Sequence, residues 1–239
     1  MSDVSRIVAS LVEVPADATR PVLIGIAGGV AVGKSVAADE VRGELPGRVD
    51  VVGTDGFLFP NGVLAQRGLV HRKGFPESYD VDALRSFLTA ARAGALPRPV
   101  PCYSHVTYDV VGERLVAALD VLIVEGLNVL AAAADLLDVA VYLDASEDQL
   151  EAWYTARFLE LVAEARDDPS SFYRTFADLD ADQAAELANQ VWRGVNLVNL
   201  RDHVAPSRAR AGCVITKGAH HEVVAVEYQP HLATETERS

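Results

Sequence analysis

The feature that most constrains this chain is the segment VLIGIAGGVAVGKS at residues 22–35. Its first six residues are apolar and predict a buried strand, and a helical pattern follows its last residue. Between them stands Gly-x-x-x-x-Gly-Lys-Ser, the spacing of a phosphate-binding loop in the strand-to-helix context that such a loop requires. The segment therefore predicts a binding site for a nucleoside triphosphate.

Each residue type in this loop has a physical reason. Gly28 and Gly33 allow backbone angles that a side chain would forbid, so successive N–H groups can curl around phosphate oxygens. The helix that begins near Gly33 adds the positive end of its dipole. Lys34 brings a mobile positive charge to the outer phosphates, and the Ser35 hydroxyl can bind Mg²⁺. The residues predicted to surround the nucleotide phosphates are Gly28, Gly29, Val30, Ala31, Val32, Gly33, Lys34, Ser35 and Val36.

Composition and charge narrow the classes of function. A chain of 239 residues with 50% hydrophobic content can bury one sizeable core, so residues 1–239 are expected to form a single domain. The formal net charge of −13 argues against a nucleic-acid partner, because no basic surplus exists to displace counterions. Two cysteines are too few for a disulfide framework. With no signal peptide and no membrane-spanning apolar run, a cytoplasmic enzyme is expected.

Apolar runs and helical patterns alternate along the chain. Strands are expected at residues 22–27, 50–53, 121–124, 138–144, 213–217 and 222–228. Helices are expected at residues 4–14, 80–92, 147–166 and 180–197. Strands that alternate with helices predict an α/β fold with a doubly wound, mainly parallel sheet and helices on both faces.

Three segments stand outside this alternation. Residues 57–79 show neither a helical nor an alternating period, and loops of that length are usually functional or disordered. Aromatic residues and a basic cluster favour a functional loop; the cluster consists of Arg67, His71, Arg72 and Lys73. Residues 1–20 are expected to be a short extension, and residues 230–239 a flexible tail.

Carboxylates at strand ends supply candidate catalytic groups. Ligands of an open parallel sheet bind beyond the carboxyl ends of its strands, where Asp55, Glu125 and Asp144 stand. Each of these residues alone is equally typical of a turn or a strand end. Because the phosphate loop should open on the same edge, Asp55 is predicted to accept the proton of a substrate hydroxyl. Glu125 is predicted to organise Mg²⁺ together with Ser35.

Two further pairs of side chains are candidates for substrate contacts. Tyr103 and His105 are two residues apart in an extended segment, so they face the same side and can hydrogen-bond one ligand. Tyr154 and Arg157 are three apart on a predicted helix and share a face. The alternatives are a structural histidine, and a solvated arginine beside a core aromatic. The functional interpretation has the arginine close over the transferred phosphoryl group.

Together these motifs resemble those of the bacterial type I pantothenate kinases, a family of P-loop kinases. The matching stretches occur in the family's order and are GIAGGVAVGKS, GTDGFLFPN, RKGFPESYD, YSHVTYD, LIVEGLNVL, WYTARFLE and WRGVNLVNLRDHVAPSRARA. The resemblance spans roughly residues 22–229. It implies a P-loop kinase fold, a homodimer and ATP-dependent phosphorylation of the primary hydroxyl of pantothenate, the first step towards coenzyme A.

The resemblance also implies roles for single residues. Lys34 and Ser35 would serve the triphosphate and Mg²⁺, and Asp55 would be the catalytic base. Arg157 would stabilise the moving phosphoryl group. The residues that would hold pantothenate are Tyr103, His105, Tyr154 and Asn196. Two more, Lys217 and His221, match a segment that lies near the nucleotide base.

Departures from the family concern the nucleotide and its regulation. The family has a helical segment before the phosphate loop that supplies part of the adenine contact, where this chain has about twenty residues. Val36 stands where threonine is usual, and Asp39 where the family has an arginine near the nucleotide phosphates. Leu161 and Arg166 replace phenylalanines that help receive the thiol end of inhibitory coenzyme A. Weak inhibition by coenzyme A and a raised requirement for ATP are therefore expected.

Two other interpretations stay open. A related P-loop kinase could phosphorylate a different alcohol, such as a nucleoside, a sugar phosphate or a pantothenate-like intermediate. A non-catalytic homologue could bind the nucleotide alone, which the short N-terminus and Asp39 favour. The intact set of substrate residues favours pantothenate, and turnover against a panel of alcohols discriminates among the three.

Overall fold

A six-stranded sheet forms the centre of the computed structural model, which describes residues 2–15 and 17–229. Its strands are β1 (Val22–Gly28), β2 (Val49–Gly53), β5 (Val121–Glu125), β6 (Val139–Asp144), β7 (Cys213–Lys217) and β8 (Val223–Tyr228). The spatial order is β2-β5-β1-β6-β7-β8, and only β8 runs antiparallel to its neighbour. The predicted doubly wound, mainly parallel sheet is confirmed. The predicted tail, residues 230–239, lies outside the described residues.

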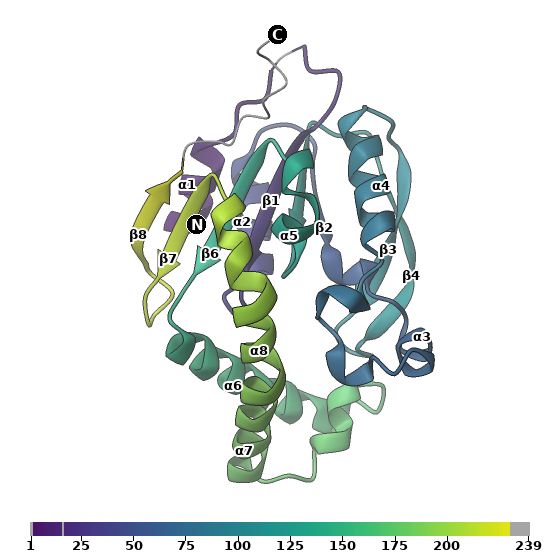
Figure 1. Ribbon diagram of the computed structural model, residues 1–239, viewed down its shortest axis with the longest axis vertical. Helices are drawn as coiled ribbons and strands as arrows, with labels where there is room; N and C mark the ends of the chain where they lie inside the picture. Colours follow the sequence, from purple (N-terminus) through teal and green to yellow (C-terminus); the bar gives the residue numbers. More distant parts are fainter. Residues whose placement is uncertain (1, 16, 230–239) are drawn as a thin grey trace.

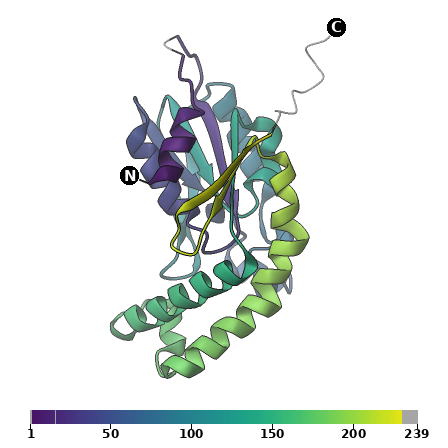
Figure 2. The same ribbon diagram turned by 90° about the vertical axis from the view of Figure 1, so that its left-hand side faces the viewer.

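Helices cover both faces of this sheet (Figure 2), as predicted. On one face, α1 (Asp3–Ser10) packs on α2 (Lys34–Glu44), which contacts β1, β2 and β5. On the other, α5 (Val129–Ala133) contacts β1 and α4 (Val81–Arg92). Because both faces are covered, β1, β5 and β6 are almost entirely buried, which explains their continuous apolar sequences.

Two helices extend beyond the sheet as an arm (Figures 1 and 2). They are α6 (Glu147–Glu164) and α7 (Ala181–Val191), which pack side by side. Phe158 and Val162 of α6 meet Ala184 and Ala188 of α7, whose small side chains allow the helices to approach closely. The helix predicted to end at residue 197 instead continues through π-helical turns, the short α8 (Leu197–Asn199) and a 3-10 turn to residue 210.

A β-hairpin that the sequence analysis did not predict lies beside the central sheet. Its strands are β3 (Arg98–Ser104) and β4 (Asp109–Val116), which pair antiparallel. The outer strand leaves Val111 and Leu115 exposed, so the usual alternation of buried and exposed residues is weak. The hairpin holds Tyr103 at its inner end, close to the end of β2.

Two expected segments differ from the structure. The first helix ends at Ser10 rather than residue 14, because Leu11 and Val12 close it by bonding to carbonyls three residues earlier. Residues 57–79 are not a featureless loop, since they contain α3 (Asn61–Gln66) and two 3-10 turns. Helix α3 begins directly after Pro60, whose carbonyl accepts from the Val63 amide. No helix in the described ranges is long and apolar enough to cross a bilayer.

The junction after β5 gives a test of this packing. A Cβ on Gly126 would lie 1.7 Å from Thr54 Oγ1 and 2.8 Å from Thr54 Cβ. Thr54 is fully buried, so it cannot move into solvent. We expect Gly126→Ala to lower the free energy of unfolding by about 1–3 kcal/mol, measured by urea denaturation. Gly43→Ala in α2 is the control because nothing lies within 4 Å of its Cβ; equal effects of the two substitutions would contradict the prediction.

Candidate active site

The pairing of three neighbouring strands brings the chemical groups of the site to one edge. Glu125, the last residue of β5, is level with Gly53 of β2 and with Ile26 of β1. Asp55 lies in the 3-10 turn that follows β2, and the phosphate loop follows β1. Asp55, Glu125 and the phosphate loop therefore meet at the carboxyl edge of the sheet, as predicted.

The phosphate loop has the backbone that its sequence predicts. Gly33 has a φ of 89° and directly precedes α2, a conformation that favours glycine. Lys34 Nζ donates a hydrogen bond to the Gly29 carbonyl at 2.9 Å, so the ammonium lies folded over the loop. Ser35 Oγ donates to Glu125 Oε1 at 3.1 Å. A hydroxyl and a carboxylate oxygen so close together are the hard ligands that fit Mg²⁺.

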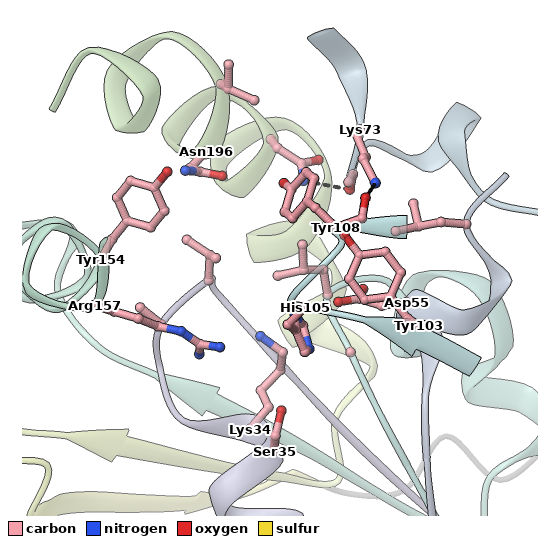
Figure 3. A pocket seen from close by; sticks show the side chains of 18 of the residues that line it. Lys34, Ser35, Asp55, Lys73, Tyr103, His105, Tyr108, Tyr154, Arg157 and Asn196 are labelled. Carbon is pink, nitrogen blue, oxygen red and sulfur yellow. Dashed lines mark hydrogen bonds between the residues drawn. The ribbon is translucent and has the colours of Figure 1, made fainter. Parts of the chain in front are cut away.

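A cavity of about 210 Å³ opens at this edge of the sheet (Figure 3). Its lining includes all of the predicted catalytic and substrate residues and the predicted metal ligand Ser35, drawn from the central sheet, the hairpin and the helical arm. These residues are Lys34, Ser35, Asp55, Tyr103, His105, Glu125, Tyr154, Arg157 and Asn196. Groups from Lys34 to Asn196, far apart in the sequence, thus line one cavity.

Two residues predicted near the nucleotide base do not line this cavity. Lys217 Nζ donates to the Val32 carbonyl at 2.7 Å, so it contacts the phosphate loop. His221 stacks on Trp153, with 3.9 Å between the ring centroids. Of the three strand-end carboxylates, Asp144 also lies outside the cavity lining and is paired with an arginine of the last 3-10 turn.

Opposite charges at the cavity floor offset part of the cost of burial. Burial lowers the pKa of Lys34, and the nearby Glu125 and Asp55 oppose that change. Burial likewise raises the pKa of Glu125, and the Lys34 ammonium opposes it. Burial also lowers the pKa of His105, so its imidazole is neutral at pH 7 and can both donate and accept a hydrogen bond.

Arg157 is the cationic group of the cavity that is free to meet a phosphoryl group. It lies on α6 and points into the cavity beside Lys34 (Figure 3). In the described part of the chain, its guanidinium makes no ion pair and no hydrogen bond. Most arginines of the chain are paired with carboxylates, so this unpaired one fits the predicted contact with a transferred phosphoryl group.

Several residues of the cavity wall were not predicted from the sequence. They include Leu58, Tyr79, Tyr108, Phe158, Tyr173, Val191, Val195 and Asn199. Lys73 was predicted only as one member of a basic cluster, and it is the member of that cluster that lines the cavity. Arg67 and Arg72 instead stack on Phe59 and Phe75, with 3.9 and 3.7 Å to the ring centroids.

Hydroxyl and amide groups stand among the apolar side chains of the outer wall, where an acceptor would lie. The Tyr154 hydroxyl lies beside the Asn196 amide (Figure 3). Burial raises the pKa of Tyr154 to about 12, an effect that the hydrogen bond with Asn196 reduces. Tyr103 packs edge-on against His105, with 5.1 Å between ring centroids. The tyrosines are therefore protonated donors at pH 7. The wall suits a small molecule that carries several hydroxyl, amide or carboxylate groups.

Sequence comparison places the chain among known proteins. The pantothenate kinase of Sorangium cellulosum is 48% identical over 222 residues, which cover 87% of this chain and 72% of that protein. That of Xanthobacter autotrophicus is 43% identical over 233 residues, covering 90% and 72%. The chain belongs to the pantothenate kinase family. None of the protein-family models compared with the sequence matches it.

Solved structures show the same fold in other kinases. D-glycerate 3-kinase from Cryptococcus neoformans superposes with a TM-score of 0.65 at 13% identity, covering 96% of this pantothenate kinase homologue and all of that chain. Phosphoribulokinase from Rhodobacter spheroides gives a TM-score of 0.54 at 12% identity, covering 83% and 71%. At such low identity these likenesses support the P-loop kinase fold alone.

Lys73 gives a test of the cavity's electrostatics. Burial lowers its pKa to about 8, although Asp109 and Asp55 oppose the shift. Half of its amines should be deprotonated near that pH, whereas an ordinary lysine with a pKa of about 10.4 stays charged. We expect the rate of Lys73 acetylation by acetic anhydride to rise with pH through a midpoint near 8. Peptide mass spectrometry measures it, and the chain's only other lysines are Lys34 and Lys217. A midpoint above pH 10, as in the urea-denatured control, would contradict the prediction.

Proposed function

We propose that this protein uses ATP and Mg²⁺ to phosphorylate the primary hydroxyl of pantothenate in the cytoplasm. One observation carries the proposal: a single cavity joins the phosphate loop to Asp55 and to a wall that carries several hydroxyl and amide groups. Relatives that are 40–48% identical over most of the chain and are named pantothenate kinase support the choice of acceptor. The donor half and the acceptor half of a kinase site are both present.

The phosphate loop binds the donor. Its backbone N–H groups and the start of α2 hold the β- and γ-phosphates of ATP, and Lys34 exchanges its contact with the Gly29 carbonyl for a phosphate oxygen. Ser35 and Glu125, whose side chains lie 3.1 Å apart, would hold the divalent cation. When bound, the cation neutralises charge on the phosphates. Arg157 extends across the cavity toward the transferred group, where charge develops as the phosphoryl group moves.

The other half of the cavity binds and activates the acceptor. Tyr103, Tyr154 and Asn196 hold pantothenate by hydrogen bonds, and neutral His105 orients it. The Asp55 carboxylate accepts the hydroxyl proton while the hydroxyl oxygen forms its bond to the γ-phosphorus. The bond from that phosphorus to the bridging oxygen breaks, and the products are ADP and a phosphate monoester.

Replacing the base tests this function directly. We expect the unchanged protein to phosphorylate pantothenate faster than nucleosides, sugar phosphates or other pathway alcohols, with ADP release as the readout. Asp55→Asn should lower kcat by about 10²–10⁴-fold and leave the Kd of ATP, measured by calorimetry, within twofold. Near-normal turnover of the variant would contradict the role of Asp55. Preference for another alcohol would contradict the substrate, and ATP binding without turnover of any alcohol would indicate a non-catalytic protein.

Substitutions of Lys34 and of Arg157 should change the kinetics in different ways. Lys34 contacts phosphates before reaction, so Lys34→Ala should weaken ATP binding and lower kcat together. Arg157→Ala should mainly lower kcat, because its contact strengthens as the phosphoryl group moves. Exposed Arg174, which does not line the cavity, provides the control substitution Arg174→Ala. Equal losses of ATP affinity in the Lys34 and Arg157 variants would mean that Arg157 binds ATP in the ground state.

Asp39 should also weaken feedback inhibition by coenzyme A. Asp39 forms an ion pair with Arg42 at 3.0 Å and offers no donor to a phosphate. We expect coenzyme A to inhibit weakly at sub-saturating ATP, and Asp39→Arg to strengthen inhibition about tenfold or more through one charge-assisted hydrogen bond. The same variant should lower the KM of ATP. Potent, ATP-competitive inhibition of the unchanged protein would overturn this reading of Asp39.

A further inference from the structure

Tyr79 makes the one side-chain hydrogen bond of Asp55 in the described part of the chain. Its hydroxyl donates to Asp55 Oδ1 at 3.2 Å. The Tyr79 side chain lines the cavity but is only 4% exposed, so its ring is fixed by packing. The second oxygen of Asp55 has no partner among the described residues and is the one available to a ligand.

The backbone holds these two residues in a fixed relation. Tyr79 ends the segment 57–79, and Leu58 pairs with it in an antiparallel bridge. The Phe59 amide donates to the Ser78 carbonyl at 2.9 Å, and the Asp80 amide donates to the Phe57 carbonyl at 2.8 Å. The two ends of the segment are thus joined directly beside the turn that carries Asp55. The contact between the two side chains is a property of this junction and does not depend on the tip of the segment.

The chemistry fixes the direction of this hydrogen bond. An ionised carboxylate only accepts, so the tyrosine hydroxyl is the donor. Burial raises the pKa of Tyr79 well above its usual value, and the negative charge of Asp55 adds to that effect, so the hydroxyl keeps its proton. Torsion about the last bond of an aspartate side chain is broad when nothing restrains it. A fixed donor on one oxygen restricts that rotation and aims the other oxygen at the cavity.

We propose that Tyr79 is a positioning residue, which holds the Asp55 carboxylate in the one orientation that accepts the proton of the substrate hydroxyl. The inference rests on the proposed kinase function and adds a residue that acts on the reaction only through Asp55. Tyr79 therefore affects proton transfer and leaves the binding of ATP to the phosphate loop unchanged.

A double-mutant cycle separates this role from a structural one. Tyr79→Phe removes a single oxygen and keeps the ring, so it should fold with a thermal midpoint near that of the unchanged protein. We expect kcat to fall about 10- to 100-fold, the loss for a hydrogen bond to a charged group, with both KM values within twofold. In an Asp55→Ala background, the same substitution should change kcat by less than twofold. Tyr142→Phe, at a buried tyrosine of β6 outside the cavity lining, is the control.

The outcomes discriminate between the inference and the function on which it rests. Equal losses from Tyr79→Phe in both backgrounds, or no loss in either, would overturn the positioning role while pantothenate turnover still stands. If the unchanged protein prefers another alcohol of the panel, the proposed substrate fails, and the cycle is measured with that alcohol. Strong coupling between the two residues then still supports the inference, and a protein that phosphorylates no alcohol overturns both.

Discussion

The pairing of β5 with β1 on one side and β2 on the other is the constraint on which the site depends. Because Glu125 is level with Gly53 and Ile26, β2 and β5 end together and β1 continues only two residues further, to Gly28. The phosphate loop, Asp55 and the carboxylate beside Ser35 are brought together by that alignment without any long flexible segment. A shift of one residue in either ladder would turn these side chains to the opposite face of the sheet. In the observed register Glu125 lies beside Ser35, so the strand pairing places the site.

Burying the charges of Lys34 and Glu125 at this edge costs free energy, and contacts within the site offset part of that cost. Lys34 and Glu125 each oppose the other's loss of charge, and Ser35 adds a hydrogen bond to the carboxylate. The chain has only three lysines, and all of them lie at the cavity or the phosphate loop with pKa values lowered by burial. The rest of the surface relies on arginine for its ion pairs. A phosphate ligand bound at the loop would place further negative charge beside Lys34 and Lys217.

The sequence was most informative where one local rule decides the structure. Buried parallel strands give continuous apolar runs, and the phosphate loop has a fixed spacing, so the sheet edge with Asp55 and Glu125 could be predicted. The strand β4 could not, because its exposed face and Gly112 leave no clear alternation. Tertiary contacts also decide which basic residue of 57–79 reaches the cavity. Arg72 forms an ion pair with Glu77, whereas Lys73 lines the cavity. No pattern in the sequence indicates which of the two basic residues reaches the cavity.

The central claim is that one cavity holds donor and acceptor in position for direct phosphoryl transfer. A crystal structure with a non-hydrolysable ATP analogue and pantothenate tests it most directly. The predicted complex has the primary hydroxyl within about 3 Å of the Asp55 carboxylate and facing the γ-phosphate, with Lys34 on the oxygens of that phosphate. Pantothenate bound outside the cavity, or with its carboxylate end toward the γ-phosphate, would contradict the claim.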